Sequence, residues 1–274
     1  MSRKEFNLKA YDNINLYGQS WLPDGETKAV INLIHGIGEH STRYAAMAEY
    51  YTAKGIAIYA IDYRGHGKSE GKRGHTPEYE SFMKDIDALL EYSAKDNDCR
   101  KVFIYGHSLG GNLVINYVLR RNPNITGLIA SSPWLKLAFE PSKFDVAIGG
   151  LMRKIFPTFT QKTKLKTDDL SRNKDNNETY KKDDLVHGYI SVSTFFGARE
   201  AAQWALDNAS KMNVPFLLMH GSADKMTSPE GSKEFASKSD KTELKIWEGF
   251  YHEIHNEEEN QQVYDWVINW VERL

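Results

Sequence analysis

One pattern repeats along this chain: a short apolar run is followed by a longer segment with helical spacing of its apolar residues. The apolar runs lie at 29–34, 56–61, 102–105, 126–130, 215–219 and 244–247. The helical patterns lie at 44–53, 79–94, 109–120, 198–209, 229–237 and 258–274. Near-continuous apolar runs are typical of strands that are covered on both faces. Their alternation with helices predicts an α/β fold with a mainly parallel central sheet and helices on both faces.

The two ends of the chain need separate readings. Segments 6–10 and 14–21 flank Asp12-Asn13 and predict a β-hairpin before the repeating pattern begins. The last helical pattern carries an apolar stripe of Val and Trp opposite acidic and amide residues. A membrane anchor would carry basic residues there, so we interpret this stripe as a face that packs on the core.

The segment 135–196 interrupts the alternation. Its first half, 139–159, is rich in Phe, Ile, Leu and Met, whereas 162–184 is dense in Lys, Asp, Asn and Thr. An excursion of this length between two strands predicts a cap inserted over the carboxyl edge of the sheet. The expected division is therefore a core at 1–134, a cap or lid at 135–196 and the rest of the core at 197–274. The apolar half of the cap either packs on the core or forms a lid that faces lipid.

Composition excludes several classes of protein. A chain of 274 residues with 41% apolar content can bury a large core. Its 35 basic and 37 acidic residues give no electrostatic case for binding nucleic acid. Cys99 is the only cysteine, so neither an intrachain disulfide nor a cysteine-based metal site is expected. No secretory signal or bilayer-spanning run is visible, which predicts a cytoplasmic protein. Transient contact of the cap with a membrane surface is compatible with this location.

The stretch KVFIYGHSLGGNLVINYVLR at 101–120 predicts a strand, a very tight turn at Ser108 and then a helix. Gly106 and Gly110 flank the serine in the pattern GxSxG. In this strand–turn–helix context the pattern indicates a nucleophile elbow, which lifts the serine oxygen clear of the sheet. The alternative is a serine that only caps the helix.

A serine hydroxyl needs a base, and the base needs an acid that fixes its tautomer. The expected chain order is serine, acid, histidine. Asp224 and His252 each follow the end of a predicted strand, which is where open α/β sheets build their sites. Taken separately, Asp224 could be a turn residue and His252 a histidine in a surface loop. In order with Ser108, they predict a catalytic triad.

Rival residues stay open at this point. His255 is a second candidate base, and Asp207 or Asp240 could be the acid. We prefer His252 because it comes first in its loop. The segment HEIHNE resembles the zinc signature HExxH but has Asn256 where the second histidine belongs, so no metal site is predicted.

Two backbone amides are expected to bind the oxyanion that forms when an ester carbonyl is attacked. One belongs to Leu109, directly after the nucleophile. The other comes from the loop after the first parallel strand, where Ile37 follows His35-Gly36.

Five motifs together carry a resemblance to a known family. They are HGIGEHSTRY at 35–44, DYRGHGKSEGKRG at 62–74, GHSLGG at 106–111, GSADKMTSP at 221–229 and YHEIHNE at 251–257. The chain resembles the monoacylglycerol lipases and lysophospholipase-like α/β-hydrolases from about residue 5 to its end. LSRNK at 170–174 and YKKDDLVHG at 180–188 look like the cap of the same family.

The resemblance implies an α/β-hydrolase fold, the triad named above and the two oxyanion donors. It places Glu39, Arg43, His255 and the cap residue Tyr180 at the polar end where glycerol leaves. Glu39 and His255 can form hydrogen bonds to vicinal hydroxyls, and Arg43 can orient Glu39 by a charge-assisted pair. Glu39 and Arg43 could also form only a structural salt bridge. The acyl tunnel would come from cap residues such as Ile148, Leu151, Met152 and Ile155. We interpret RGHG at 64–67 as a structural loop.

The sequence thus predicts a serine carboxylester hydrolase. It would cleave monoacylglycerols, which are small lipid esters, to fatty acid and glycerol through an acyl-enzyme, without a metal or organic cofactor. A lysophospholipase or general carboxylesterase is the first alternative. An aminopeptidase, a thioesterase and a non-catalytic hydrolase-fold binding protein are more distant ones.

Overall fold

The computed structural model describes residues 1–139, 141–163 and 165–274. Within these residues, eight strands form one sheet in the order β1-β2-β4-β3-β5-β6-β9-β10. The strands are β1 (Ser2–Lys9), β2 (Asn15–Leu22), β3 (Ala29–Ile34), β4 (Ile56–Ile61), β5 (Val102–His107), β6 (Gly127–Ser131), β9 (Phe216–Gly221) and β10 (Thr242–Trp247). From β4 to β10 all neighbours are parallel, whereas β1 and β2 pair as an antiparallel hairpin. The predicted α/β fold and its initial hairpin are confirmed.

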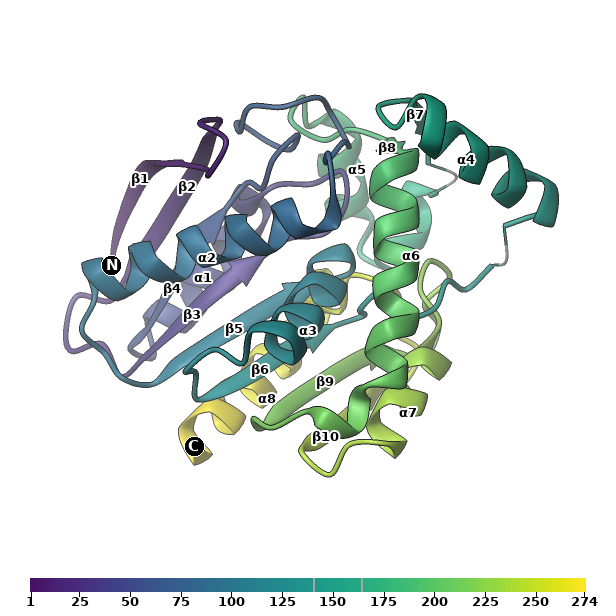
Figure 1. Ribbon diagram of the computed structural model, residues 1–274. Helices are drawn as coiled ribbons and strands as arrows, with labels where there is room; N and C mark the ends of the chain where they lie inside the picture. The colour runs from purple at the N-terminus through teal and green to yellow at the C-terminus, as the bar shows by residue number, and fades with distance from the viewer. Residues whose placement is uncertain (140, 164) are drawn as a thin grey trace.

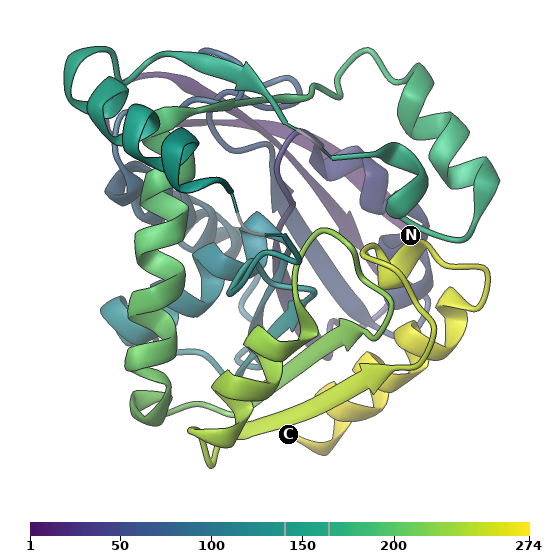
Figure 2. The same cartoon turned by 90° about the vertical axis from the view of Figure 1, so that its right-hand side faces the viewer.

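Helices cover both faces of this sheet, as Figures 1 and 2 show. One face carries α2 (Tyr79–Asp96), α3 (Leu109–Arg121), α6 (Val192–Asp207) and α7 (Pro229–Ser237). The other face carries α1 (Ala45–Thr52) and α8 (Asn260–Arg273), which contact each other. In α8, Val263, Val267, Trp270 and Val271 are buried in the core, whereas Trp266 and Leu274 of the same apolar stripe are 37% and 40% exposed. Most of the stripe is therefore a core face.

The segment between β6 and α6 holds the smaller elements. They are α4 (Lys143–Ile155), β7 (Thr160–Lys162), the 3₁₀ turn η2 (Thr167–Asp169), α5 (Lys174–Lys182) and β8 (Tyr189–Ser191), which pairs antiparallel with β7. Figure 1 places α4 and β7 beyond the end of the sheet, next to α6. Helix α6 begins at Val192 instead of the predicted 198, because the Ser191 side chain accepts a hydrogen bond from the Thr194 amide and caps it.

The parallel pairing brings distant segments to one edge. Strand β5 lies between β3 and β6, and β6 lies beside β9, which pairs with β10. The carboxyl ends of these parallel strands therefore meet, and the turns that follow them form the site described next.

Candidate active site

Ser108 occupies a strained turn between β5 and α3. Its backbone angles are φ 54° and ψ −115°, in the region that favours glycine. A Cβ at Gly106 would overlap the Gly110 carbonyl oxygen, and one at Gly110 would overlap that of Ile34. The turn is therefore so tight that both flanking positions require glycine, as a nucleophile elbow does.

Ser108, His252 and Asp224 form one hydrogen-bonded line. His252 Nε2 lies 2.9 Å from Ser108 Oγ, and His252 Nδ1 lies 2.7 Å from Asp224 Oδ2. Because a carboxylate only accepts, Nδ1 carries the proton, and Nε2 is left to accept the serine hydroxyl. This is the arrangement in which an imidazole can remove the proton of a serine nucleophile.

The rival candidates lie elsewhere. Asp207 and Asp240 are exposed, and Asp207 accepts from Gln203 on its own helix. His255 is buried, and its ring stacks on Tyr44 at 4.8 Å between centroids. In the part of the chain that the structure describes, none of the three forms a hydrogen bond with Ser108.

Electrostatics suit the line of three. Burial alone would lower the pKa of His252, but the charge and hydrogen bond of Asp224 outweigh it, and the pKa is raised above 6.5. Burial works against the Asp224 carboxylate, yet His252 and the hydrogen bonds it accepts hold its pKa well below the usual range. The backbone amides of Met226 and Thr227 donate to its Oδ1 at 2.7 and 3.1 Å. Asp224 thus stays ionised beside the imidazole.

The expected oxyanion donors lie next to the nucleophile. A Cβ at Gly36 would sit 3.1 Å from the Ser108 Cβ, so the loop that carries Ile37 passes close to the serine. Leu109 begins α3, and the first amides of a helix have no acceptor within it. Ile37 lies in the lining of both cavities described below. Both amides are therefore positioned near Ser108.

Two cavities meet at Ser108 and His252, which line both. The first, the apolar cavity, has a volume of about 520 Å³. Its wall includes Trp134, Leu137, Val146, Phe159, Phe195 and Phe196. The second, the polar cavity, has a volume of about 330 Å³. Glu39, Thr167, Tyr180, Lys181, Asp183 and Glu253 are among its lining residues.

Of the four residues expected along the acyl tunnel, Ile148 and Met152 line the apolar cavity. Leu151 and Ile155 do not; their side chains are 59% and 69% exposed. Residues four apart share one face of a helix, so 148 and 152 face the cavity while 151 and 155 face outward. The expectation for these two residues is corrected accordingly.

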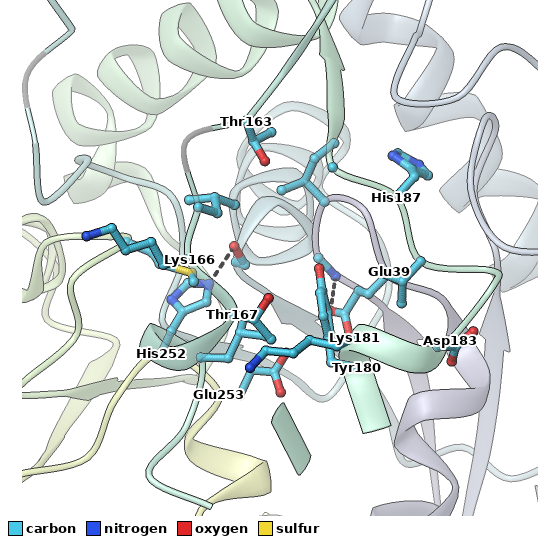
Figure 3. Close-up of a pocket in the computed structure, with 18 of the residues that line it drawn as sticks. Glu39, Thr163, Lys166, Thr167, Tyr180, Lys181, Asp183, His187, His252 and Glu253 are labelled. Atoms are coloured by element: carbon cyan, nitrogen blue, oxygen red, sulfur yellow. Dashed lines mark hydrogen bonds between the residues drawn. The ribbon is translucent and has the colours of Figure 1, made fainter. Parts of the chain in front are cut away.

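Glu39 and Arg43 belong to a buried ionic cluster at the polar cavity. Arg43 Nη1 lies 2.6 Å from Glu39 Oε2 and 2.7 Å from Glu253 Oε1, and Nη2 lies 2.8 Å from Glu253 Oε2. The guanidinium stacks on the Tyr180 ring at 4.6 Å. In Figure 3, Glu39 and Tyr180 lie across the cavity from His252. The salt bridge foreseen for Glu39 and Arg43 is present, with both side chains beside the cavity.

Sequence reasoning missed Glu253, whose only signal was its place directly after His252. Asn176 on α5 and Asn256 also donate to its carboxylate, at 3.0 and 2.8 Å. Burial works against its charge, but Arg43 holds the pKa of Glu253 well below its usual range. Burial instead raises the pKa of Glu39, which accepts one hydrogen bond from Arg43 where Glu253 accepts two. The cluster joins the polar half of the segment 135–196 to the loop that carries His252.

His255 does not line the polar cavity, contrary to the resemblance. The 3₁₀ turn Ile254–Asn256 directs its ring inward, where it contacts Tyr44 and His107. Arg43 likewise lies behind Glu39 and does not line the wall, whereas Glu39 and Tyr180 do. Any action of His255 on a bound alcohol would have to pass through other residues.

The RGHG loop is a structural element, as expected. Arg64 is buried and pairs with Asp85 at 2.6 Å and with Asp12 at 2.8 Å. These two ion pairs fix the loop to α2 and to the turn of the initial hairpin.

Over residues 1–139, 141–163 and 165–274, no cluster of three or more His, Cys, Asp or Glu side chains could hold a metal ion.

Comparison with known proteins agrees with this geometry. The family described as serine aminopeptidase, S33, matches residues 25–259. Human monoglyceride lipase is 33% identical over 95% of this chain and 88% of its own. Phospholipase YtpA of Bacillus subtilis is 32% identical over 86% of this chain and 92% of its own. The crystal structure of Paleococcus ferrophilus monoacylglycerol lipase superposes with a TM-score of 0.86 at 35% identity, covering 93% of this chain and 98% of that one.

Proposed function

This chain belongs to the serine aminopeptidase S33 family of α/β-hydrolases, and on that premise we propose that it hydrolyses monoacylglycerols to fatty acid and glycerol. One observation carries the proposal: the line Ser108–His252–Asp224 stands where an apolar and a polar cavity meet. An ester whose carbonyl lies at Ser108 can place its acyl chain in the first cavity and its alcohol in the second. The substrate is therefore amphipathic, with a small polar alcohol.

The reaction begins when Ser108 Oγ attacks the ester carbonyl and its proton passes to His252 Nε2. Asp224 holds the imidazole by Nδ1 and stabilises its positive charge. The amides of Ile37 and Leu109 bind the oxyanion. The C–O bond to the alcohol then breaks, and the alcohol leaves with the proton from Nε2.

The second half of the reaction repeats these steps with water. His252 removes a proton from water, the hydroxide attacks the acyl-enzyme, and Ser108 regains its proton as the fatty acid leaves. Glu39 and Tyr180 line the polar cavity and can bind the glycerol hydroxyls, with Arg43 holding Glu39 in place. In this role Arg43 is a positioning residue.

A substrate panel tests the proposal. We expect 1-monooleoylglycerol to be cleaved faster than its amide and thioester analogues, and we expect Ser108→Ala to abolish the activity and labelling by a fluorophosphonate probe. Ser237→Ala is the matched control, because this serine is exposed on α7 and contacts Glu234 of its own helix. Preference for the amide, or a folded wild-type protein without labelling, would refute the proposal.

A lysophospholipid is the second candidate substrate. Lys166 and Lys181 line the polar cavity, whose volume of about 330 Å³ leaves room for an alcohol larger than glycerol. The similarity to a phospholipase points the same way. Hydrolysis of 1-oleoyl-lysophosphatidylcholine by wild type, Lys166→Ala and Lys181→Ala in the same panel separates the two candidate substrates. If the lysine variants lose activity on the lysophospholipid but keep activity on the monoacylglycerol, the lysophospholipid is favoured.

We also propose that the segment 135–196 is a cap and that its apolar half touches membrane surfaces transiently. Within the described residues, no helix is both apolar enough and long enough to cross a bilayer. Outward-facing Phe144, Leu151, Ile155 and Phe156 are exposed around α4. Binding of such a face scales with the apolar area it can bury. Liposome flotation of wild type and Leu151→Asp tests this. The same bound fraction for both proteins, or no bound wild-type protein, would contradict the proposal.

A further inference from the structure

The carboxylate of Asp224 is held by two imidazoles, and only one of them belongs to the triad. His252 Nδ1 lies 2.7 Å from Asp224 Oδ2, and His220 Nε2 lies 3.1 Å from the same oxygen. His220 is on β9 and is completely buried. Beyond it, Ser232 on α7 lies with its Oγ 2.7 Å from His220 Nδ1. A five-residue chain thus runs from the nucleophile at the turn after β5 to α7.

The partners of His220 decide its tautomer. Its Nε2 faces the Asp224 carboxylate and, at 3.3 Å, the Thr227 carbonyl oxygen, and both groups only accept. Nε2 therefore carries the proton and donates it to the carboxylate. Nδ1 is left as an acceptor, and the buried hydroxyl of Ser232 donates to it. Both ring nitrogens are satisfied, which fixes the ring without a choice of alternative orientations.

His220 fills a need that the other ligands of Asp224 leave. The amides of Met226 and Thr227 bind Oδ1, so they do not fix the oxygen that faces His252. The Thr227 hydroxyl lies 2.9 Å from Oδ2, but it has one proton and also lies 3.0 Å from the Ser132 carbonyl oxygen. The N–H of His220 is the remaining donor to Oδ2 within the described residues, apart from His252 itself.

We infer that His220 is a positioning residue of the active site, which keeps the Asp224 carboxylate in line with His252. The inference rests on the proposed serine hydrolase chemistry. His220 touches no reacting atom and moves no proton in the reaction. It acts by holding the Oδ2 oxygen of Asp224 in place. Nδ1 of His252 then keeps its hydrogen-bond acceptor, and Nε2 stays free to accept the Ser108 proton.

Removal of this N–H should slow chemistry more than binding. A hydrogen bond to a buried charged group is among the stronger ones in proteins, and its loss lowers kcat by about tenfold in our expectation. KM should change by less than about twofold, because His220 lines neither cavity. With one donor fewer, the carboxylate keeps more negative charge on Oδ2, which raises the pKa of His252 further. The acid limb of the pH–kcat profile should therefore move to higher pH.

The test uses the full chain with His220→Leu and His220→Gln, and with His75→Leu as control. A glutamine amide reaches about as far as Nε2 and can donate to Asp224, so it should restore most of kcat and return the acid limb toward wild type. His75 also bonds a serine, with Nδ1 2.9 Å from Ser191 Oγ, but it has no contact with Asp224. Its substitution should leave kcat and the limb unchanged. Folding is followed by circular dichroism and thermal unfolding.

Equal kcat and pH profiles in wild type and a folded His220→Leu would overturn the inference. So would a lower kcat with an unmoved acid limb, because general structural damage has that effect. If His220→Leu does not fold, Ser232→Ala decides: freeing the ring should lower kcat about threefold and move the limb in the same direction, and an unchanged enzyme would overturn the inference. Wild-type protein that neither labels with a fluorophosphonate nor cleaves esters would instead refute the proposed function.

Discussion

Replacement of Arg43 by methionine would remove the single cation from a cluster of two buried carboxylates. Glu39 and Glu253 have side chains that are 3% and 2% exposed, and Arg43 itself is 8% exposed. Methionine keeps much of the aliphatic volume and the contact with Tyr180, but no positive charge. The two carboxylates would then face each other without a compensating positive charge.

The expected loss of unfolding free energy is about 3–5 kcal/mol at pH 8, the usual cost of breaking a buried ion pair by removing one partner. The loss should depend on pH in a defined direction. Without Arg43, the pKa values of both glutamates rise, so either carboxyl can take up a proton in the folded state as the pH falls. At pH 5 this protonation relieves the repulsion, and the difference from wild type becomes smaller.

Urea unfolding of wild type and Arg43→Met at pH 8 and pH 5 measures this. The double variant Arg43→Met/Glu253→Gln removes one charge and should recover at least about 1 kcal/mol of the loss at pH 8. Lys181→Met is a suitable control, since its ammonium pairs with Asp168 and Glu178 on an exposed surface. A loss below about 1 kcal/mol, or one that is equal at both pH values, would refute the argument that the cluster is held by charge.

Three further outcomes follow from the site. Asp224→Asn should lower kcat about 10⁴-fold without unfolding the protein, because an amide N–H facing Nδ1 favours the wrong tautomer of His252. Steady-state kinetics measure this, and a near-normal kcat would contradict the triad. The acid limb of kcat/KM should have its midpoint above pH 6.5, since neutral His252 is the base and its pKa is raised; a midpoint below 6 would count against this base. Gly110→Ala should prevent stable folding, because its Cβ would overlap the Ile34 carbonyl oxygen; a thermal unfolding midpoint close to wild type would be inconsistent with the tight turn.

Several elements could be predicted from the sequence to the residue. Strands β3 and β4 and helix α7 have the predicted bounds, because each is delimited by local signals: uninterrupted apolar runs for the strands, and Ser228 before Pro229 for the helix. Helix α6 starts six residues before the predicted position, since its cap at Ser191 lies inside a short strand. The elbow at Ser108 was visible because glycine on both sides of a serine, between a strand and a helix, is itself a local pattern.

By itself the sequence determined the order of strands and helices and the tight turn at Ser108, since each depends on neighbours in the chain. It made Ser108, Asp224 and His252 the predicted triad, with His255 as a rival base. Tertiary structure alone decided which histidine meets Ser108, how Glu253 pairs with Arg43, and that His220 shares the Asp224 carboxylate. The first two contacts join residues from different turns at the sheet edge, and His220 lies only four residues before Asp224. In neither case does local spacing encode the direction of the side chain. His252 and His255 are three residues apart, yet one faces the nucleophile and the other the core. The difference arises from the packing of the loop against α5 and the sheet, which only the folded chain provides.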